Sequence, residues 1–490
     1  MLFRSQALQT NWGVSAQLDA TVGTQTITSI TAFRRFDENE IREGDLLPGA
    51  FVGLPQTHDV GPQTGKTFSQ EIRLQSPGKE FVDYVIGAYY SNSDTKRTFT
   101  RNVTQCTAVT GATGLIPCGS ANANPSTFPT GTANFGSVFK NLAFFGQATI
   151  NVTDSLRVIG GLRYTVDQLD VFHSRVTALA GPAIQPNFDQ GVFNANGNVA
   201  ASNGVPYRTK VTSTNWSSKT GLQYDITRNS TAYATFSRGY KGPAFNVFFN
   251  LTRAGADSIA PETSDAYEVG LKNTLFGGKL TLNLAGYYAK YKNFQANNPD
   301  VIIIGGVATP VSRFTNAGEV STRGGELDLV FRPVRDLNIS GGLAYTDAKI
   351  DRFRQVTGFP SIPNGTTLAY APKLKTSLGA DYRLRTGGAI DVVMGAQTSY
   401  QSSSLSAFDT NAANRAAGTI HPYAIVDLSV GIVGANDGFR IVAQVKNLFD
   451  QSFASSIGAG GPGGSFRYII PREADRYFGI TAKVNFGGSN

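Results

Sequence analysis

The chain has 490 residues, of which 41% are hydrophobic and only 16% are charged. The formal net charge is +8, but lysine and arginine are scattered, without a basic run or a nucleic-acid motif, so a nucleic-acid partner is not indicated. No apolar stretch reaches the roughly 20 residues that a membrane-spanning helix needs. With 54 glycines, 32 phenylalanines and 19 tyrosines, the composition favours strands and turns over helices.

The amino terminus, MLFRSQALQT, has neither the apolar core nor the small-residue cleavage site of a signal peptide. We interpret residues 1–10 as the truncated lead-in of an exported protein. Residues 11–486 are then expected to form one β domain, and residues 487–490 a short tail. The alternative, which the missing signal peptide leaves open, is a cytosolic protein.

Several long segments alternate between apolar and polar residues. From Leu156 to Val166, leucine, valine, tyrosine and one glycine occupy every second position, and Arg157 and Arg163 fall between them. Residues 337–346 and 373–384 repeat the pattern. This period of two predicts strands, and their length of about 10 to 16 residues exceeds the ~5–6 residues of a typical soluble strand.

Short and long connections between these strands alternate along the chain. Brief turns rich in Gly, Asn, Asp and Pro are predicted at 21–23, 77–79, 151–154, 225–229, 277–278, 333–335, 385–388 and 434–437. Long polar loops are predicted at 37–65, 94–134, 170–210, 241–261, 294–318, 350–371, 402–421 and 458–471. A membrane barrel has tight turns on one side and long loops on the other.

The pattern therefore predicts an all-β fold, a large antiparallel transmembrane β-barrel of about seventeen strands in the bacterial outer membrane. The strands are expected to start near Asn11 and to end at Phe486. One face of each strand meets lipid, and the other lines a water-filled lumen, into which Arg163, Glu326 and Asp328 are expected to point. Tyrosines near the strand ends match the aromatic girdle of such barrels.

Four groups of residues carry a resemblance to a known family. They are VKNLFDQSFASS, within the expected penultimate strand, PREADRYFGITAKVNF, as the expected last strand, YATFSRGYKGPAFN, and ETSDAYEVGLKNTLFGGKLTLNLAGYY followed by NAGEVSTRGGELDL. In this order and spacing, over nearly the whole chain, they resemble the barrel of a TonB-dependent outer-membrane receptor. The resemblance implies a barrel of about 22 strands with a plugged lumen. It also implies uptake of a scarce solute, usually a ferric siderophore, with energy supplied through TonB.

The chain departs from the family pattern in ways that lead to further expectations. The plug domain and the TonB-contacting motif are missing, together with about five of the roughly 22 strands. An incomplete barrel leaves two strand edges unpaired in lipid, where each unpaired backbone group costs several kcal/mol. We therefore expect this chain alone to be a fragment and not a competent transporter. Phe486 resembles the terminal aromatic residue that the barrel-assembly machinery reads, although residues 487–490 follow it.

Two other functions stay open beside the transport receptor. A passive diffusion porin needs no plug and no energy coupling, and a surface adhesin can also be built on a barrel. The resemblance favours the receptor, with outer-membrane lipid, lipopolysaccharide, TonB, the barrel-assembly machinery and an iron chelate as its partners. Neither enzymatic activity nor a cofactor is expected.

The candidate substrate contacts are Arg238, Lys241 and Phe245. Arg238 and Lys241 lie close together at the outer end of a predicted strand, where they form either a cationic rim for an anionic ligand or an anchor for the strand end. Phe245, Phe248 and Phe249 form an aromatic cluster in a loop. Such a cluster either stacks on an aromatic or hydrophobic ligand or packs the loop against its neighbours.

The cysteines and histidines all fall in predicted loops. Cys106 and Cys118 either form a disulfide that closes a small ring, worth ~3 kcal/mol, or stay as free thiols. A metal site would want more ligands at tight spacing, and none is expected. His58, His173 and His421 lie in separate loops without a nucleophile motif nearby, so we expect them to be solvent-exposed and no catalytic residues to be present.

Overall fold

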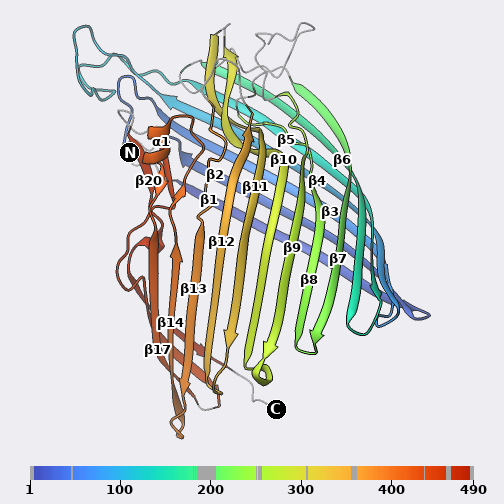
Figure 1. Cartoon of the computed structure of the whole chain (residues 1–490). Helices are drawn as coiled ribbons and strands as arrows, with labels where there is room; N and C mark the ends of the chain where they lie inside the picture. The colour runs from blue at the N-terminus through green and yellow to red at the C-terminus, as the bar shows by residue number, and fades with distance from the viewer. Residues whose placement is uncertain are drawn as a thin grey trace. The chain divides into compact units, whose positions relative to one another are not determined.

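A computed structural model of the chain describes residues 5–45, 48–179, 181, 184, 206–249, 251, 256–304, 307–354, 361–434, 436–459 and 465–485. Within these residues, seventeen strands form one antiparallel sheet (Figure 1), so the predicted fold class and strand number are confirmed. The chain forms two compact units. Unit 1 comprises Met1–Ala148, Gly161–Ser217 and Tyr240–Pro261, and unit 2 comprises Thr149–Gly160, Ser218–Gly239 and Glu262–Asn490.

The strands of the large sheet are β1 (Gln6–Val22), β2 (Gln25–Glu43), β3 (Gln56–Gln75), β4 (Val82–Thr104), β5 (Thr130–Asn151), β6 (Leu156–Leu179), β7 (Tyr207–Thr227), β8 (Ser230–Lys241), β9 (Glu262–Leu275), β10 (Leu280–Ile304), β11 (Val307–Phe331), β12 (Leu337–Phe353), β13 (Leu374–Leu384), β14 (Ile390–Gln401), β17 (Tyr423–Gly434), β18 (Phe439–Lys446) and β21 (Tyr477–Val484). Two small hairpins join β15 (Ser404–Leu405) to β16 (Thr419–Ile420) and β19 (Ser456–Ala459) to β20 (Phe466–Ile469). The helical turns are α1 (Ala412–Ala417), η3 (Phe276–Gly278) and η5 (Arg472–Ala474). In the described part of the chain, no helix is both long and apolar enough to cross a membrane.

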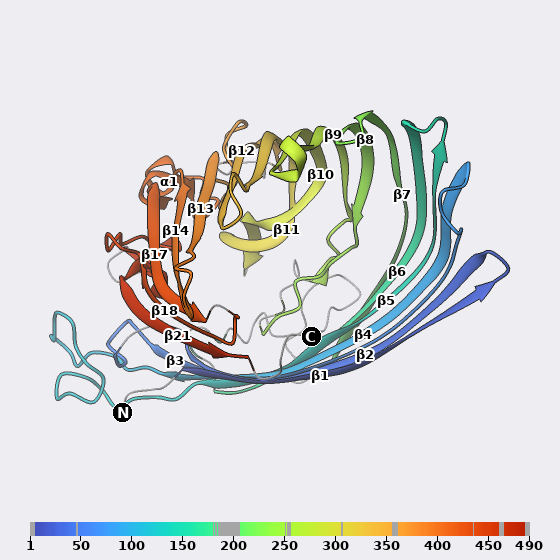
Figure 2. The ribbon, with the colours of Figure 1, turned by 90° about the horizontal axis from the view of Figure 1, so that it is seen from below.

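The short turns lie where the sequence predicts them. β1 and β2 are joined through Gly23, whose φ of 63° is the left-handed conformation that glycine adopts without steric cost. Gly277 and Gly278 play the same part between β9 and β10, with φ of 65° and 89°. In unit 2, β12, β13, β14 and β17 then pair side by side in chain order (Figure 2).

Most of the long connections are shorter than predicted, because the strands continue beyond the apolar segments. β2 extends to Glu43 and β4 to Thr104. The predicted loop 294–318 is wrong: β10 and β11 stay paired as far as Ile304 and Val307. Polar strand ends can pair in this way because backbone hydrogen bonds need no apolar side chains.

The alternation of faces is present as predicted. The register of β12 and β13 pairs Leu343 with Thr376 and Gly341 with Leu378. Leu343, Tyr345 and Leu378 are 43%, 48% and 51% exposed, as suits side chains that meet lipid. The face that alternates with this apolar face carries serine, lysine and aspartate, and we call it the polar face.

The polar face also carries the side chains that were expected to point into the lumen. Glu326 and Asp328 pair with Ala344 and Gly342 on this face of β11 and β12. In unit 1, Arg163 lies on one face of β6. The residues that follow it on that face, at every second position from Thr165 to Arg175, are buried. The polar face of β6 is therefore covered along its second half.

The family-like segment VKNLFDQSFASS is not one strand: its first two residues end β18, its last residue, Ser456, begins β19, and the residues between them belong to neither strand. β18 ends at Lys446, and Asn447 turns the chain with a φ of 51°. The backbone N–H of Asn447 donates to Asp427 at 2.9 Å, and its side-chain amide donates to the carbonyls of Gln451 and Glu473 at 3.1 and 3.2 Å. Asparagine tolerates the left-handed conformation, so this segment is a hydrogen-bonded turn. The expected last strand is likewise shorter, because η5 precedes β21.

A network of ion pairs joins three turns at the short-turn ends of the strands in unit 2. Arg385 donates to both carboxylate oxygens of Asp336, at 2.7 and 2.8 Å. Arg383 donates to Asp391 and to Asp437, each at 2.8 Å. The hydrogen bond from Arg385 holds the pKa of the Asp336 carboxyl below its usual value.

Candidate functional site

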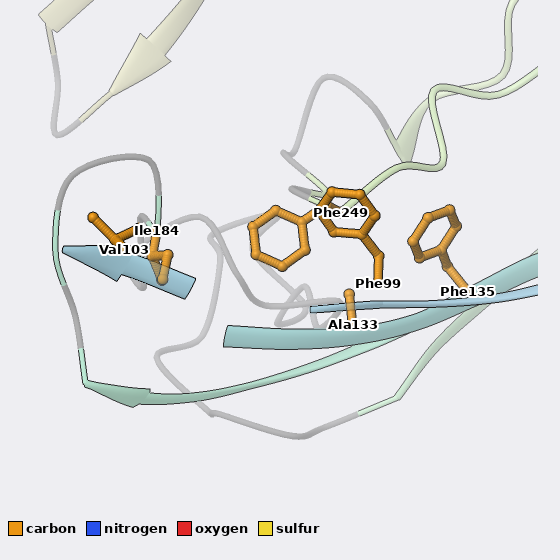
Figure 3. Packing of buried hydrophobic residues seen from close by; sticks show 6 residues of the cluster. All are labelled: Phe99, Val103, Ala133, Phe135, Ile184 and Phe249. Atoms are coloured by element: carbon orange, nitrogen blue, oxygen red, sulfur yellow. The ribbon is translucent and has the colours of Figure 1, made fainter. Parts of the chain in front are cut away.

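The segment 243–249, which follows β8, covers part of the polar face of unit 1 at the end where the long loops lie. Its residue Phe249 is fully buried, and the centroid of its ring lies 5.1 Å from that of Phe99 on β4. The apolar cluster around them comprises Phe99, Val103, Ala133, Phe135, Ile184 and Phe249 (Figure 3). Full burial of one such side chain stabilises the covering segment by about 1.5–3 kcal/mol.

Three arginines surround the Phe99 ring. The guanidinium carbons of Arg97, Arg42 and Arg101 lie 5.2, 5.7 and 5.7 Å from its centroid. A cation over a ring face is worth about 0.5–2 kcal/mol, and more when it is shielded from water. The aromatic cluster therefore lies next to three positively charged side chains.

Two carboxylates hold these arginines in place. Both oxygens of Asp59 accept from Arg101 at 2.7 Å, and one accepts from Arg42 at 3.2 Å. The Asp59 side chain is only 1% exposed, which makes this a shielded and well-oriented pair. Glu40 accepts from Arg97 at 2.5 Å. With three guanidinium groups and two carboxylates, these five residues carry a formal positive charge.

Phe249 meets two further groups of β6 on its other sides. The guanidinium carbon of Arg175 lies 4.5 Å from the centroid of the Phe249 ring. His173 donates from Nε2 to the Phe249 carbonyl at 3.2 Å. His173 is 1% exposed and lies within β6, so the prediction of an exposed loop histidine is wrong. The strand extends past the predicted end at residue 170, and the segment 243–249 buries it.

A pocket of 380 Å³ lies beside this cluster, between the segment 243–249 and the polar faces of β3 to β6. Its lining is mainly apolar and aromatic, with a few polar groups, and comprises Gln63, Thr95, Arg97, Phe135, Gly136, Ser137, Leu169, Val171, Pro243, Ala244, Phe245, Val247 and Phe248. Among these described lining residues, Arg97 supplies the formal charge. Concave, largely apolar sites with a few fixed polar groups are typical of small-molecule binding.

The structure does not bring the three predicted substrate contacts together. Phe245 lines the pocket. Lys241 is an exposed residue at the end of β8. Phe236 of β8 contacts the ring of Tyr267, which is 53% exposed on the apolar face. Arg238 lies two residues further along the same strand, and because side chains alternate between faces, it lies on the apolar face as well. Their roles as substrate contacts remain predictions.

The main polar residue of the pocket was missed in the sequence. Arg97, Phe99, Arg101 and Val103 occupy every second position of a segment that was predicted to be part of the loop 94–134. This alternation of arginine with apolar residues is the signal that could have identified the segment as a strand. It was obscured because the opposite face of β4 is polar here, with Lys96, Thr98, Thr100 and Asn102 alternating with these residues.

The structure joins Cys106 to Cys118 in a disulfide. The disulfide lies in the connection between β4 and β5. Next to it, Cys118 donates its backbone N–H to Ala50, and Val52 donates to Ile116, each at 2.9 Å. The disulfide therefore orders a segment that pairs with the connection between β2 and β3.

The remaining predicted sites lie apart from the pocket. His58 is half-buried within β3, and His421 is exposed in a connection as predicted. Phe486 lies outside the described residues. Among the described side chains, no group of three or more His, Cys, Asp or Glu is placed to hold a metal ion.

Three comparisons bear on what this arrangement does. A family model described as TonB dependent receptor-like, beta-barrel, matches residues 3–448. The metal-pseudopaline receptor CntO of Pseudomonas aeruginosa is 27% identical over 238 residues, which cover 48% of this chain and 29% of that receptor. The ferric-pyoverdine 358 receptor of Pseudomonas putida is 24% identical over 343 residues, which cover 70% of this chain and 35% of that receptor.

The fold agrees with a solved receptor structure. The ferric yersiniabactin uptake receptor FyuA from Yersinia pestis superposes with a TM-score of 0.73 at 16% sequence identity, covering 99% of this chain and 62% of that one. The chain spans about a third of the length of the curated receptors that it matches.

Proposed function

Because the chain belongs to the family of TonB-dependent receptor β-barrels, which lie in the bacterial outer membrane, we propose that it is the barrel part of a receptor for a metal chelate, foremost a ferric siderophore. The receptor takes up this scarce solute with energy passed through TonB, which acts on a plug domain inside the barrel. The two curated relatives, named as receptors for metal-pseudopaline and ferric-pyoverdine, support a metal chelate as the cargo.

The observation that carries the proposal is the pocket on the polar face. It is lined by aromatic and apolar side chains and lies beside a cluster of formal positive charge, at the loop end of the strands. Many ferric chelates are bulky anions with apolar arms, and a positive field in a cleft raises the rate at which anions arrive. A simple diffusion channel has no need for a covered pocket of this kind.

The test is uptake through the complete receptor. The full gene that encodes this chain is expressed in a strain that lacks its own siderophore receptors, and radioactive iron uptake is measured for a panel of ferric siderophores, with and without TonB. The proposal expects saturable uptake of at least one chelate that falls to background without TonB. Uptake that is linear in concentration and unchanged without TonB would instead establish the porin alternative.

The same proposal includes the partners of the barrel. Outer-membrane lipid and lipopolysaccharide contact the apolar face, and the barrel-assembly machinery inserts the chain by reading the terminal segment that includes Phe486. The chain acts as a transport receptor and catalyses no reaction. Crosslinking in membranes from a photoreactive residue at the exposed position Leu378 tests the first contact, since it should yield lipid adducts.

A further inference from the structure

The chemistry of the pocket lining points to one class of chelate, and we propose that the pocket binds an aromatic arm that carries negative charge, such as a catecholate or a phenolate. This inference rests on the proposed function and deepens it. It concerns which chelates the receptor accepts, whereas the proposed function would hold for a chelate of any class. The argument depends on Phe245, Phe248, Phe135 and Arg97.

Phe248 lines the pocket, and its ring also packs against two other aromatic rings. It is 45% exposed, although its centroid lies 5.7 Å from that of Phe99 and 6.1 Å from that of Phe135. A large aromatic side chain that is packed on one side and open on the other is suited to stack on a flat ligand. Phe245 and Phe135 line the same pocket, so it offers a ligand ring more than one aromatic side chain.

Arg97 supplies the charge and is already oriented. Its side chain is 19% exposed, and its guanidinium is held by Glu40 and lies over the Phe99 ring. A guanidinium has five N–H donors in a planar fork, so some donors remain for a second acceptor at the pocket. A catecholate or phenolate oxygen is such an acceptor, and it is attached to the ligand ring that would stack on Phe248.

The other common chelating groups fit less well. A polycarboxylate needs several converging cations, but Arg42 and Arg101 are engaged by Asp59 and neither lines the pocket. Three aliphatic hydroxamate arms carry no ring, and their single negative charges cancel that of the ferric ion, so such a chelate would use neither the rings nor the charge of the pocket. The volume of 380 Å³ lies at the lower end of the range of about 300–1,000 Å³ for ligand pockets, which suits one arm of a chelate.

The experiment compares two synthetic probes on the full chain, refolded in detergent. One probe is gallium(III) held by a hexadentate tris-catecholate, and the other is gallium(III) held by a hexadentate aliphatic trihydroxamate. Binding of each is measured by isothermal titration calorimetry. The inference expects the catecholate probe to bind at least 10-fold more tightly than the hydroxamate probe.

Three variants locate the effect. Phe248→Leu keeps the apolar volume but removes the ring, and should weaken the catecholate probe about 5-fold, within the range of aromatic pair energies. Arg97→Gln should weaken it about 10-fold, as expected for a lost charge-assisted hydrogen bond. Both should leave the hydroxamate probe within 2-fold of its original affinity. Phe276→Leu is the matched control, because Phe276 is 72% exposed in the turn after β9.

The outcomes separate this inference from the proposed function. Tight binding of the hydroxamate probe, with no effect of Phe248→Leu on either probe, would overturn the aromatic arm and leave the chelate receptor standing. An equal loss for both probes in Arg97→Gln would also overturn it, since the charge would then act on any chelate. If neither probe binds to a chain whose folded state is shown by heat-modifiable gel migration, the inference is contradicted, whereas the proposed function is decided separately by TonB-dependent uptake of the panel of ferric siderophores.

Discussion

Replacing Phe249 with alanine should release the segment 243–249 from the polar face of unit 1. The ring is fully buried against Phe99 and lies under the Arg175 guanidinium, at 4.5 Å from its carbon. Truncation of a buried phenylalanine costs about 3–5 kcal/mol. Because the strands beneath are held by their own ladders, we expect this cost to appear as local opening and not as global unfolding.

The lower figure of about 3 kcal/mol corresponds to a rise of roughly 150-fold in the opening equilibrium, at 1.36 kcal/mol for each factor of ten. Hydrogen–deuterium exchange with mass spectrometry, on peptides that cover 243–249, measures this directly in detergent. Protection should fall in Phe249→Ala and persist in Phe276→Ala, which removes an exposed ring elsewhere. Unchanged protection of 243–249 would refute the view that Phe249 anchors the segment.

Three further predictions concern the loops and turns. Replacing Cys106 and Cys118 by serine should destabilise the β4–β5 connection by ~3 kcal/mol, the entropy of closing a ring of this size, and limited proteolysis should cut there at lower protease concentration. The pKa of Asp336 is lowered in the folded state, so its ion pair stabilises the turn fully above the ordinary pKa of 3.8, and this stability is lost as the pH falls through the folded value. Arg385→Gln should reduce this acid dependence, measured by hydrogen exchange of the turn at a series of pH values, and a small part should persist because Arg335 and Arg383 also act on Asp336. Asn447→Ala should lower the free energy of unfolding by about 1–3 kcal/mol, because alanine is strained in the left-handed conformation and cannot make the amide hydrogen bonds. The temperature at which the folded gel band disappears should fall, and an unchanged temperature would count against the role of this turn.

The strands and short turns could be predicted because their signals are local. A period of two is visible within ten residues, and a glycine such as Gly23 marks a turn by its own backbone freedom. The ends of the strands could not be predicted in the same way. β10 and β11 continue to Ile304 and Val307 because each supplies the other's backbone partners, and no property of one segment alone reveals that.

The candidate site was predicted only in part, for a related reason. Phe245 was identified because aromatic residues in a loop are conspicuous in a sequence. Asp59 and Arg101 are 42 residues apart, and only the register of β3 on β4 makes them a pair. Arg238 and Lys241 are close together in the sequence, but side chains alternate between the two faces of a strand, so nearness in sequence does not place two residues on the same face.

The central claim is that a long antiparallel wall has one face toward lipid and the other toward a wet interior that holds the chelate pocket. Spin labels placed singly at each position from 337 to 346 of β12, in chain refolded into lipid vesicles, test it most directly by their collision rates with oxygen and with a water-soluble nickel chelate. We expect the odd positions, which include Leu343 and Tyr345, to favour oxygen and the even positions to favour nickel, with a strict period of two. Equal accessibility at neighbouring positions, or a period near 3.6 residues, would contradict the account.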